Sequence, residues 1–140
     1  MFKTVLVALD GSELSDRVIQ TLLELNLKPD AKVILAHVIS PVDSGMETPA
    51  NLPAADSEIE LYRHTEQQLL AYQADLPCPS QLEIVTGDPA DEIIRLANIY
   101  QAKLIVIGSR GLTGVNRILQ GSVSSQVVTD AHCSVLVVKP

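Results

Sequence analysis

Tryptophan is absent from the sequence, and one phenylalanine and three tyrosines bring the aromatic content of its 140 residues to only 3%. Hydrophobic residues nevertheless make up 46% of the chain, so the core must be built from valine, isoleucine, leucine and alanine. That composition favours layers of helix and sheet. Only two cysteines occur, Cys78 and Cys133. They have neither the spacing of a metal site nor that of a redox pair, so we expect reduced thiols.

Basic residues are also few. The chain has 10 lysines and arginines against 17 aspartates and glutamates, which gives a net charge of −7. This balance argues against nonspecific binding to nucleic acid or to an anionic membrane. No apolar run approaches the roughly 20 residues that cross a bilayer, and the N-terminus lacks the basic and apolar segments of a signal peptide. We therefore expect one soluble, cytoplasmic domain over residues 1–140, with no nucleic acid or membrane partner.

The hydrophobic pattern predicts strands that alternate with helices. Strands are expected at residues 4–9, 32–39, 81–86, 104–107 and 134–138, and helices at residues 13–25, 57–75, 89–100 and 123–131. Residues 41–56 are rich in Pro, Gly, Ser and Asn and should form a long, flexible loop, either a lid, a partner surface or plain disorder. An imperfect apolar stripe along the second helix is expected to face the core: Ile59, Tyr62, Leu69, Tyr72 and Leu76.

Such alternation implies parallel strands joined by right-handed crossovers, in a single open five-stranded α/β sheet. The first and fourth strands should be central neighbours, which the order 3-2-1-4-5 satisfies. Residues 81–86 alternate polar with apolar, as an edge strand does. The last strand should form the opposite, apolar edge, and exposed apolar edges invite pairing. We therefore expect a homodimer in which Val135 to Val138 pairs with its two-fold mate.

Local signals mark the helix starts and the polar residues near strand ends. Ser12 is a plausible N-cap, and Asp88 followed by Pro89 predicts another helix start. Asp10 lies at the carboxyl end of a central strand, where open α/β sheets place their ligand crevice. The alternative for Asp10 is a turn-forming or capping carboxylate. His37 is interpreted as a packed, hydrogen-bonded residue rather than as a catalytic or metal-binding one.

The most informative stretch is the buried strand at 104–107 and the segment that follows it. The glycines and polar residues there are Gly108, Arg110, Gly111, Gly114, Arg117, Gly121 and Ser122. Glycine lets the backbone approach a ligand, and a helix N-terminus offers unpaired N–H groups and partial positive charge. Together these features predict a phosphate or other anion site. The alternative is that the glycines serve turns and packing only, since neither common phosphate motif is present.

The spacing Gly108-x2-Gly111-x9-Gly121-Ser122 resembles the nucleotide loop of the universal stress protein family, in its ATP-binding branch. The stretches KTVLVALDGSELS, VILAHVIS, TGDPADEII and AHCSVLVVKP also resemble that family, so that the likeness covers nearly the whole chain. The resemblance implies the same sheet order, helices on both faces as in adenine nucleotide alpha hydrolase-like proteins, and a homodimer.

The resemblance also implies a nucleotide site. In that family the residue matching Asp10 lies near the sugar and the metal–phosphate region, and the backbone around Val38 binds the edge of adenine. We expect the phosphates against the backbone N–H groups of residues 108–111 and 121–123. The expected site residues are Ala8, Leu9, Asp10, Val38, Ile107, Gly108, Arg110, Gly111, Gly121, Ser122 and Val123. With so few local arginines, Mg²⁺ or Mn²⁺ should complete neutralisation, with Asp10 as the nearest ligand, directly or through water.

The resulting prediction is an ATP-binding stress-response regulator with little or no turnover, acting as a homodimer with an unidentified protein partner. No catalytic residue is assigned, because the loop has no lysine to reach a γ-phosphate and no obvious base. The alternatives are a slow ATP hydrolase and a dimeric family member that holds no nucleotide. A phosphorylated receiver domain is disfavoured, because Asp10 has no acidic neighbour and Lys139 has no helix after it.

Overall fold

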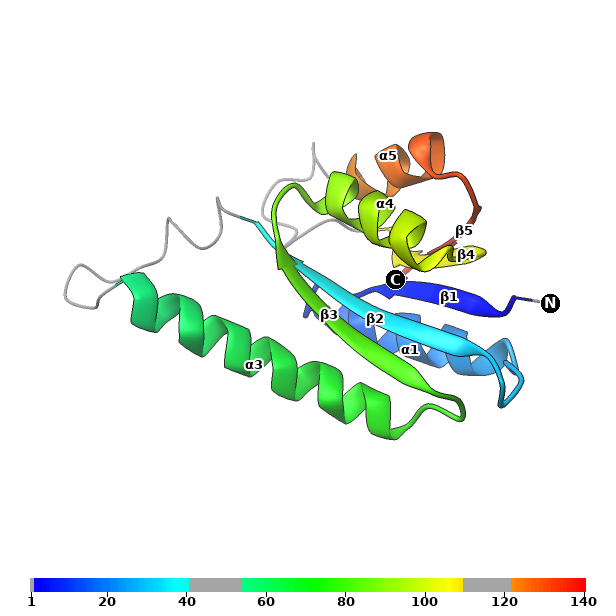
Figure 1. Cartoon of the computed structure of the whole chain (residues 1–140), viewed down its shortest axis with the longest axis horizontal. Coiled ribbons are helices and arrows are strands. Elements are labelled where there is room, and N and C mark those ends of the chain that lie inside the picture. The colour runs from blue at the N-terminus through cyan, green and yellow to red at the C-terminus, as the bar shows by residue number, and fades with distance from the viewer. Residues whose placement is uncertain (1, 41–53, 110–121) are drawn as a thin grey trace.

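The computed structural model describes residues 2–40, 54–109 and 122–140, and strands alternate with helices along them (Figure 1). The elements are β1 (Thr4–Ala8), α1 (Glu13–Glu24), β2 (Lys32–Ile39), α3 (Ala54–Ala74), β3 (Ser80–Thr86), α4 (Pro89–Tyr100), β4 (Leu104–Gly108), α5 (Ser122–Asp130) and β5 (Ser134–Val138). Every predicted strand and helix is present. Residues 54–56, expected in a loop, are instead the first residues of α3, and residues 41–53 lie outside the described ranges.

The five strands form one parallel sheet in the order β3-β2-β1-β4-β5, which confirms the predicted topology. In Figure 1, α1 and α3 lie on one face of the sheet, whereas α4 and α5 lie on the other. Ala8 of β1 pairs with Ala36 of β2 and with Ile107 of β4. The carboxyl ends of these three strands therefore meet at one edge of the sheet.

The core is aliphatic and lies in two layers, one on each face of the sheet. Successive strand residues point to opposite faces, so Val5 and Val7 join the layer beneath α1 and α3 while Leu6 joins the layer beneath α4 and α5. All three are 0% exposed. This burial on both faces accounts for the continuous apolar runs of the central strands.

Helix α3 follows the predicted stripe only in its C-terminal half. Leu69 is buried, and Tyr72 and Leu76 pack against the core, but Ile59 and Tyr62 are 50% and 44% exposed. The prediction was wrong for these two residues because the N-terminal half of α3 extends past β3, as Figure 1 shows, and has no sheet to cover. None of the helices in the described ranges combines the length and hydrophobicity needed to cross a bilayer.

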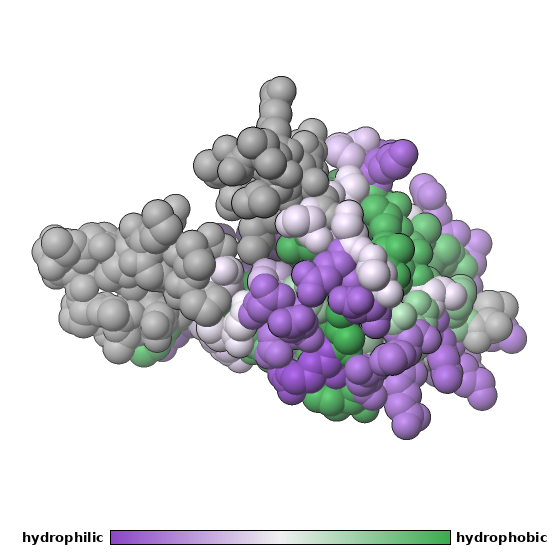
Figure 2. All heavy atoms as spheres, turned by 90° about the horizontal axis from the view of Figure 1, so that it is seen from above, coloured by the Kyte–Doolittle hydropathy of each residue, from purple (hydrophilic) through white to green (hydrophobic). Residues whose placement is uncertain are grey.

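The outer surface on the α4 and α5 side carries both hydrophilic and hydrophobic residues. Figure 2 shows hydrophilic residues over much of this face, with hydrophobic residues exposed between them. Ile99 of α4 and Val128 of α5 are among the exposed residues, at 58% and 53%. Each helix thus buries one stripe and leaves its remaining residues to solvent.

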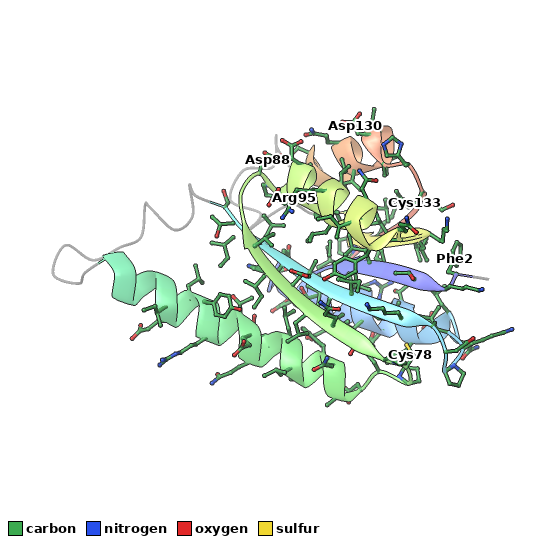
Figure 3. The ribbon with its side chains drawn as sticks, viewed as in Figure 1. Phe2, Cys78, Asp88, Arg95, Asp130 and Cys133 are labelled. Carbon is green, nitrogen blue, oxygen red and sulfur yellow. The ribbon has the colours of Figure 1, made fainter. Side chains whose placement is uncertain are left out.

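The two cysteines lie on opposite faces of the sheet. Cys78 follows α3 and packs against the layer beneath α1 and α3, whereas Cys133 precedes β5 and packs against the other layer (Figure 3). They therefore cannot bond to each other, and both are free. Burial raises the pKa of both thiols above the ordinary value, which disfavours the reactive thiolate.

Tyr72 joins α3 to α1, because its hydroxyl donates a hydrogen bond of 2.6 Å to Oδ1 of Asp16. Burial, followed by the Asp16 carboxylate, raises the pKa of Tyr72 in the folded chain. A raised folded pKa stabilises the fold fully below the unfolded value, about 10, and this contribution is lost as the pH rises further. We expect Tyr72→Phe to lose less stability than the wild-type chain above about pH 10, measured by urea unfolding at stepwise pH. Equal pH slopes would contradict this expectation.

Candidate functional site

A recess opens at the carboxyl edge of the sheet, where β1 and β4 lie side by side. The connection after β1 leads to α1 on one face, and the chain after β4 reaches α5 on the other, so this edge is the topological switch point. The recess has a cavity volume of about 50 Å³, and about 520 Å³ of empty space when the region open to solvent is included. Its lining residues are Ala8, Leu9, Asp10, Leu14, Ser15, Val18, Ala36, Val38, Pro89, Ile93, Ile107, Gly108 and Val123.

The structure brings most of the predicted site residues together around this recess. Ala8, Leu9, Asp10, Val38, Ile107, Gly108 and Val123 all line it. Ser122 is the exposed first residue of α5 and is not among the lining residues. Arg110, Gly111 and Gly121 lie outside the described residues.

Several lining residues were not predicted from the sequence. Leu14 and Val18 belong to the apolar stripe of α1, and Pro89 and Ile93 lie in the first turns of α4. The apolar spacing of Leu14, Val18 and Ile93 indicated core positions, which they do occupy, whereas Pro89 was interpreted only as a helix start. Only the three-dimensional arrangement shows that the same side chains wall a recess.

Gly108, at the end of β4, is required for packing. A Cβ atom at this position would lie 2.5 Å from Cδ2 and 2.9 Å from Cγ of Leu14. The positive φ angles among the described glycines belong to Gly11 and Gly87, so Gly108 does not depend on left-handed backbone. The packing alternative considered for the loop glycines therefore holds at Gly108, which lets α1 close onto the end of β4.

The Ser109 amide, next to Gly108, is already occupied. Its N–H donates a hydrogen bond of 2.8 Å to the carbonyl oxygen of Val138, at the end of β5. We had expected all backbone N–H groups of residues 108–111 to face the phosphates, and for Ser109 this expectation was wrong. A donor already bonded within the sheet is not free for a ligand.

Asp10 is held by the first turn of α1. Its Oδ1 atom accepts hydrogen bonds from Ser12 N at 2.9 Å, Ser12 Oγ at 2.6 Å and Ser15 Oγ at 3.1 Å. Ser12 is the N-cap of α1 and accepts from Leu14 N, as predicted. The turn-forming alternative for Asp10 is therefore present in the structure. It does not compete with a ligand role, because the same residue lines the recess.

Two further elements support the walls of the recess. Nδ1 of His37, in β2, lies 2.8 Å from the carbonyl oxygen of Leu9, which is consistent with the predicted packed role. Asp88 caps α4 by accepting from Asp91 N at 3.1 Å, and Pro89 follows it inside the helix, as predicted. Because Asp88 engages one amide and Pro89 has no N–H, α4 turns mainly apolar surface, from Pro89 and Ile93, to the recess.

A protein-built metal centre is not found among the described residues, where no three histidine, cysteine, aspartate or glutamate side chains gather closely enough to hold an ion. Asp10 is the only acidic residue lining the recess within the ranges that the structure describes. The donor set at this edge is therefore one carboxylate, whose Oδ1 is already bonded by three donors.

These features define a doubly wound α/β protein with a candidate ligand site at the switch point of its sheet. The sequence model described as the universal stress protein family matches residues 1–139, and the chain belongs to this family. Universal stress protein MJ0531 of Methanocaldococcus jannaschii is 33% identical to it over 99% of this chain and 83% of the relative.

Solved structures agree with this assignment. The hypothetical protein MJ0577 superposes with a TM-score of 0.87 at 26% identity, covering 100% of this chain and 97% of the other. A universal stress protein solved in complex with cAMP superposes with a TM-score of 0.70 at 25% identity, covering 99% and 97%. Both likenesses extend over the full sheet and its helices.

Proposed function

We propose that this protein binds ATP in the recess and acts as a nucleotide-responsive regulator with little or no turnover. The observation that carries the proposal is the convergence of the ends of β1, β2 and β4 on one recess, with Asp10, Val38 and Gly108 in its lining. The relative solved with cAMP supports an adenine nucleotide as the ligand class.

The two ends of the ligand would meet different chemistry. Ala36, Val38, Pro89 and Ile93 offer an apolar pocket of the kind that accepts a purine ring. The phosphates would lie toward the glycine-rich segment and the N-terminus of α5, where Arg110 and the Ser122 hydroxyl supply donors. The Ser109 amide is already bonded and is therefore not among the main-chain donors of this proposal.

A divalent cation fits this proposal in a limited way. Asp10 offers one oxygen, Oδ2, to which no donor is bonded within the described ranges. Mg²⁺ or Mn²⁺ would therefore be held chiefly by phosphate oxygens and water, with Asp10 contributing one contact, directly or through water. The cation would supply charge neutralisation to a site in a chain of net charge −7.

The test begins with the protein purified without added nucleotide, extracted with acid and analysed by chromatography. We expect released ATP, and calorimetric titration of the emptied protein should show binding of ATP with Mg²⁺. Released ADP together with phosphate production would favour the alternative, a slow ATP hydrolase. No binding of ATP, AMP or cAMP by the folded protein would overturn the proposal and favour a family member that works without nucleotide.

The proposal includes a homodimer formed through the free edge of β5. This strand has one neighbour, β4, and its other edge is unpaired within the described chain. Val135, Leu136 and Val137 are partly exposed there, and apolar edges invite pairing with another strand. Light scattering that shows only monomer at micromolar concentration would count against this interface.

The cytoplasm is the proposed compartment, consistent with two unpaired thiols.

Val137→Pro tests the edge directly. The Val138 carbonyl faces β4, since it accepts from Ser109 N, so the backbone of the preceding residue faces the free edge. Proline at Val137 would then remove an outward N–H without breaking the β4 ladder. We expect a shift from dimer to monomer in size-exclusion chromatography with light scattering. Val137→Thr, which keeps the N–H, should remain dimeric, and a dimeric Val137→Pro would exclude pairing through this edge.

A further inference from the structure

Ser15 is a buried polar residue in the wall of the recess that the proposed function leaves without a role. It lies in the first turn of α1 and is only 1% exposed. Its Oγ accepts a hydrogen bond of 3.1 Å from Gly11 N and donates one of 3.1 Å to Oδ1 of Asp10. A buried hydroxyl with both bonds directed at one short loop fixes the geometry of that loop.

The hydrogen bond from Ser15 helps to fix the orientation of the Asp10 carboxylate. Ser12 approaches Oδ1 from within the same turn, with its N–H and its hydroxyl, whereas Ser15 approaches from the helix that follows. Three donors on one oxygen leave the carboxylate little freedom to rotate. Oδ2 then remains the oxygen available to an incoming group, since no donor in the described ranges is bonded to it.

We propose that Ser15 is a positioning residue of the nucleotide site, an inference that rests on the proposed function. By holding Oδ1, Ser15 makes Asp10 present a single oxygen to an O–H group of the bound ligand complex. This O–H group is either a hydroxyl of the nucleotide sugar or a water molecule bound to the divalent cation. Ser15 does not touch the ligand in this proposal and acts only through Asp10.

A purely structural role is the competing explanation. Gly11 has φ of +82°, and its N–H is bonded by Ser15, so Ser15→Ala would also loosen the loop. A drop in affinity after Ser15→Ala is therefore not sufficient evidence. The two roles differ in whether the effect of Ser15 requires the Asp10 carboxylate.

A double-mutant cycle separates them, with ATP affinity measured by calorimetry on the wild type, Ser15→Ala, Asp10→Ala and the double variant. We expect Ser15→Ala to weaken ATP binding about fivefold, the size of one lost hydrogen bond. In the Asp10→Ala background the same change should have no further effect. An equal loss in both backgrounds, or no loss in either, would overturn the positioning role.

Controls keep the outcome interpretable. Thr21→Ala removes a hydroxyl from the same helix, away from the recess, and should leave ATP affinity unchanged. Ser15→Cys replaces Ser15→Ala in the cycle if the alanine variant does not fold.

Repeating the cycle with Mg²⁺ and with a chelator identifies which O–H group Asp10 binds. A loss of ATP affinity only with Mg²⁺ indicates a cation-bound water. Loss under both conditions indicates the sugar. A folded wild type that binds no ATP would overturn the proposed function and this inference together.

Discussion

Gly108→Val is expected to destabilise the fold by about 3 kcal/mol, because a side chain there overlaps an already packed core. Its Cβ would meet Cδ2 of Leu14 at 2.5 Å, and Leu14, in α1, is itself part of the buried core. Val18 Cγ2 lies 3.6 Å from the same Cβ position, so the added side chain would press on two residues of α1. Thermal unfolding should show the midpoint lowered by about 10 °C.

The cause can be verified with a compensating change. Leu14→Ala creates space next to Gly108, so Gly108→Ala should cost less in the Leu14→Ala background than in the wild type. The coupling energy expected for residues in contact is about 1–3 kcal/mol. Additive effects of the two substitutions would show that the close contact with Leu14 is not the reason for glycine at this position.

Gly111→Val and Gly121→Val are expected to have the opposite profile, with ATP binding lost and the fold retained. Under the proposed function the backbone at these positions approaches the phosphates, and a branched side chain would keep it away. Several main-chain hydrogen bonds to a charged ligand would be lost together, so affinity should fall more than about 100-fold. Calorimetry with ATP and Mg²⁺ measures the loss, and circular dichroism verifies the fold.

Gly114→Val provides the matched control for these two variants. Gly114 lies in the same glycine-rich segment but outside the Gly108-x2-Gly111-x9-Gly121-Ser122 spacing, so its valine variant should bind ATP normally. Unchanged affinity in folded Gly111→Val and Gly121→Val would remove these glycines from the site. Equal loss in all three variants would show that any bulk in the segment is harmful, and that the spacing carries no specific information.

Local signals allowed most of the fold to be predicted from the sequence. The Ser12 cap, the Asp88–Pro89 helix start and the continuous apolar run of β4 each depend on a few neighbouring residues, and each is found in the structure. Alternation and right-handed crossovers allow the observed sheet order, and the family resemblance selected it. In this order the carboxyl ends of β1, β2 and β4 lie at one edge of the sheet. Asp10, Val38 and Gly108 lie at or just beyond these ends.

The failures concern contacts between segments distant in the sequence. Nothing near Gly108 indicates that Leu14 will lie against it, or that Ser109 will give its amide to Val138. An apolar stripe says which residues of a helix share a face, but not how far the sheet beneath extends. For that reason Ile59 and Tyr62 of α3 were expected in the core although no strand reaches them.

The hydrogen bond from Ser109 to Val138 joins the start of the glycine-rich segment to the last residue of β5. Under the proposed function, the nucleotide and the second subunit would therefore act on the two ends of one short connection. Linkage is reciprocal, so any factor by which ATP changes self-association must equal the factor by which self-association changes ATP affinity. Protein concentration would then belong among the variables of every nucleotide titration.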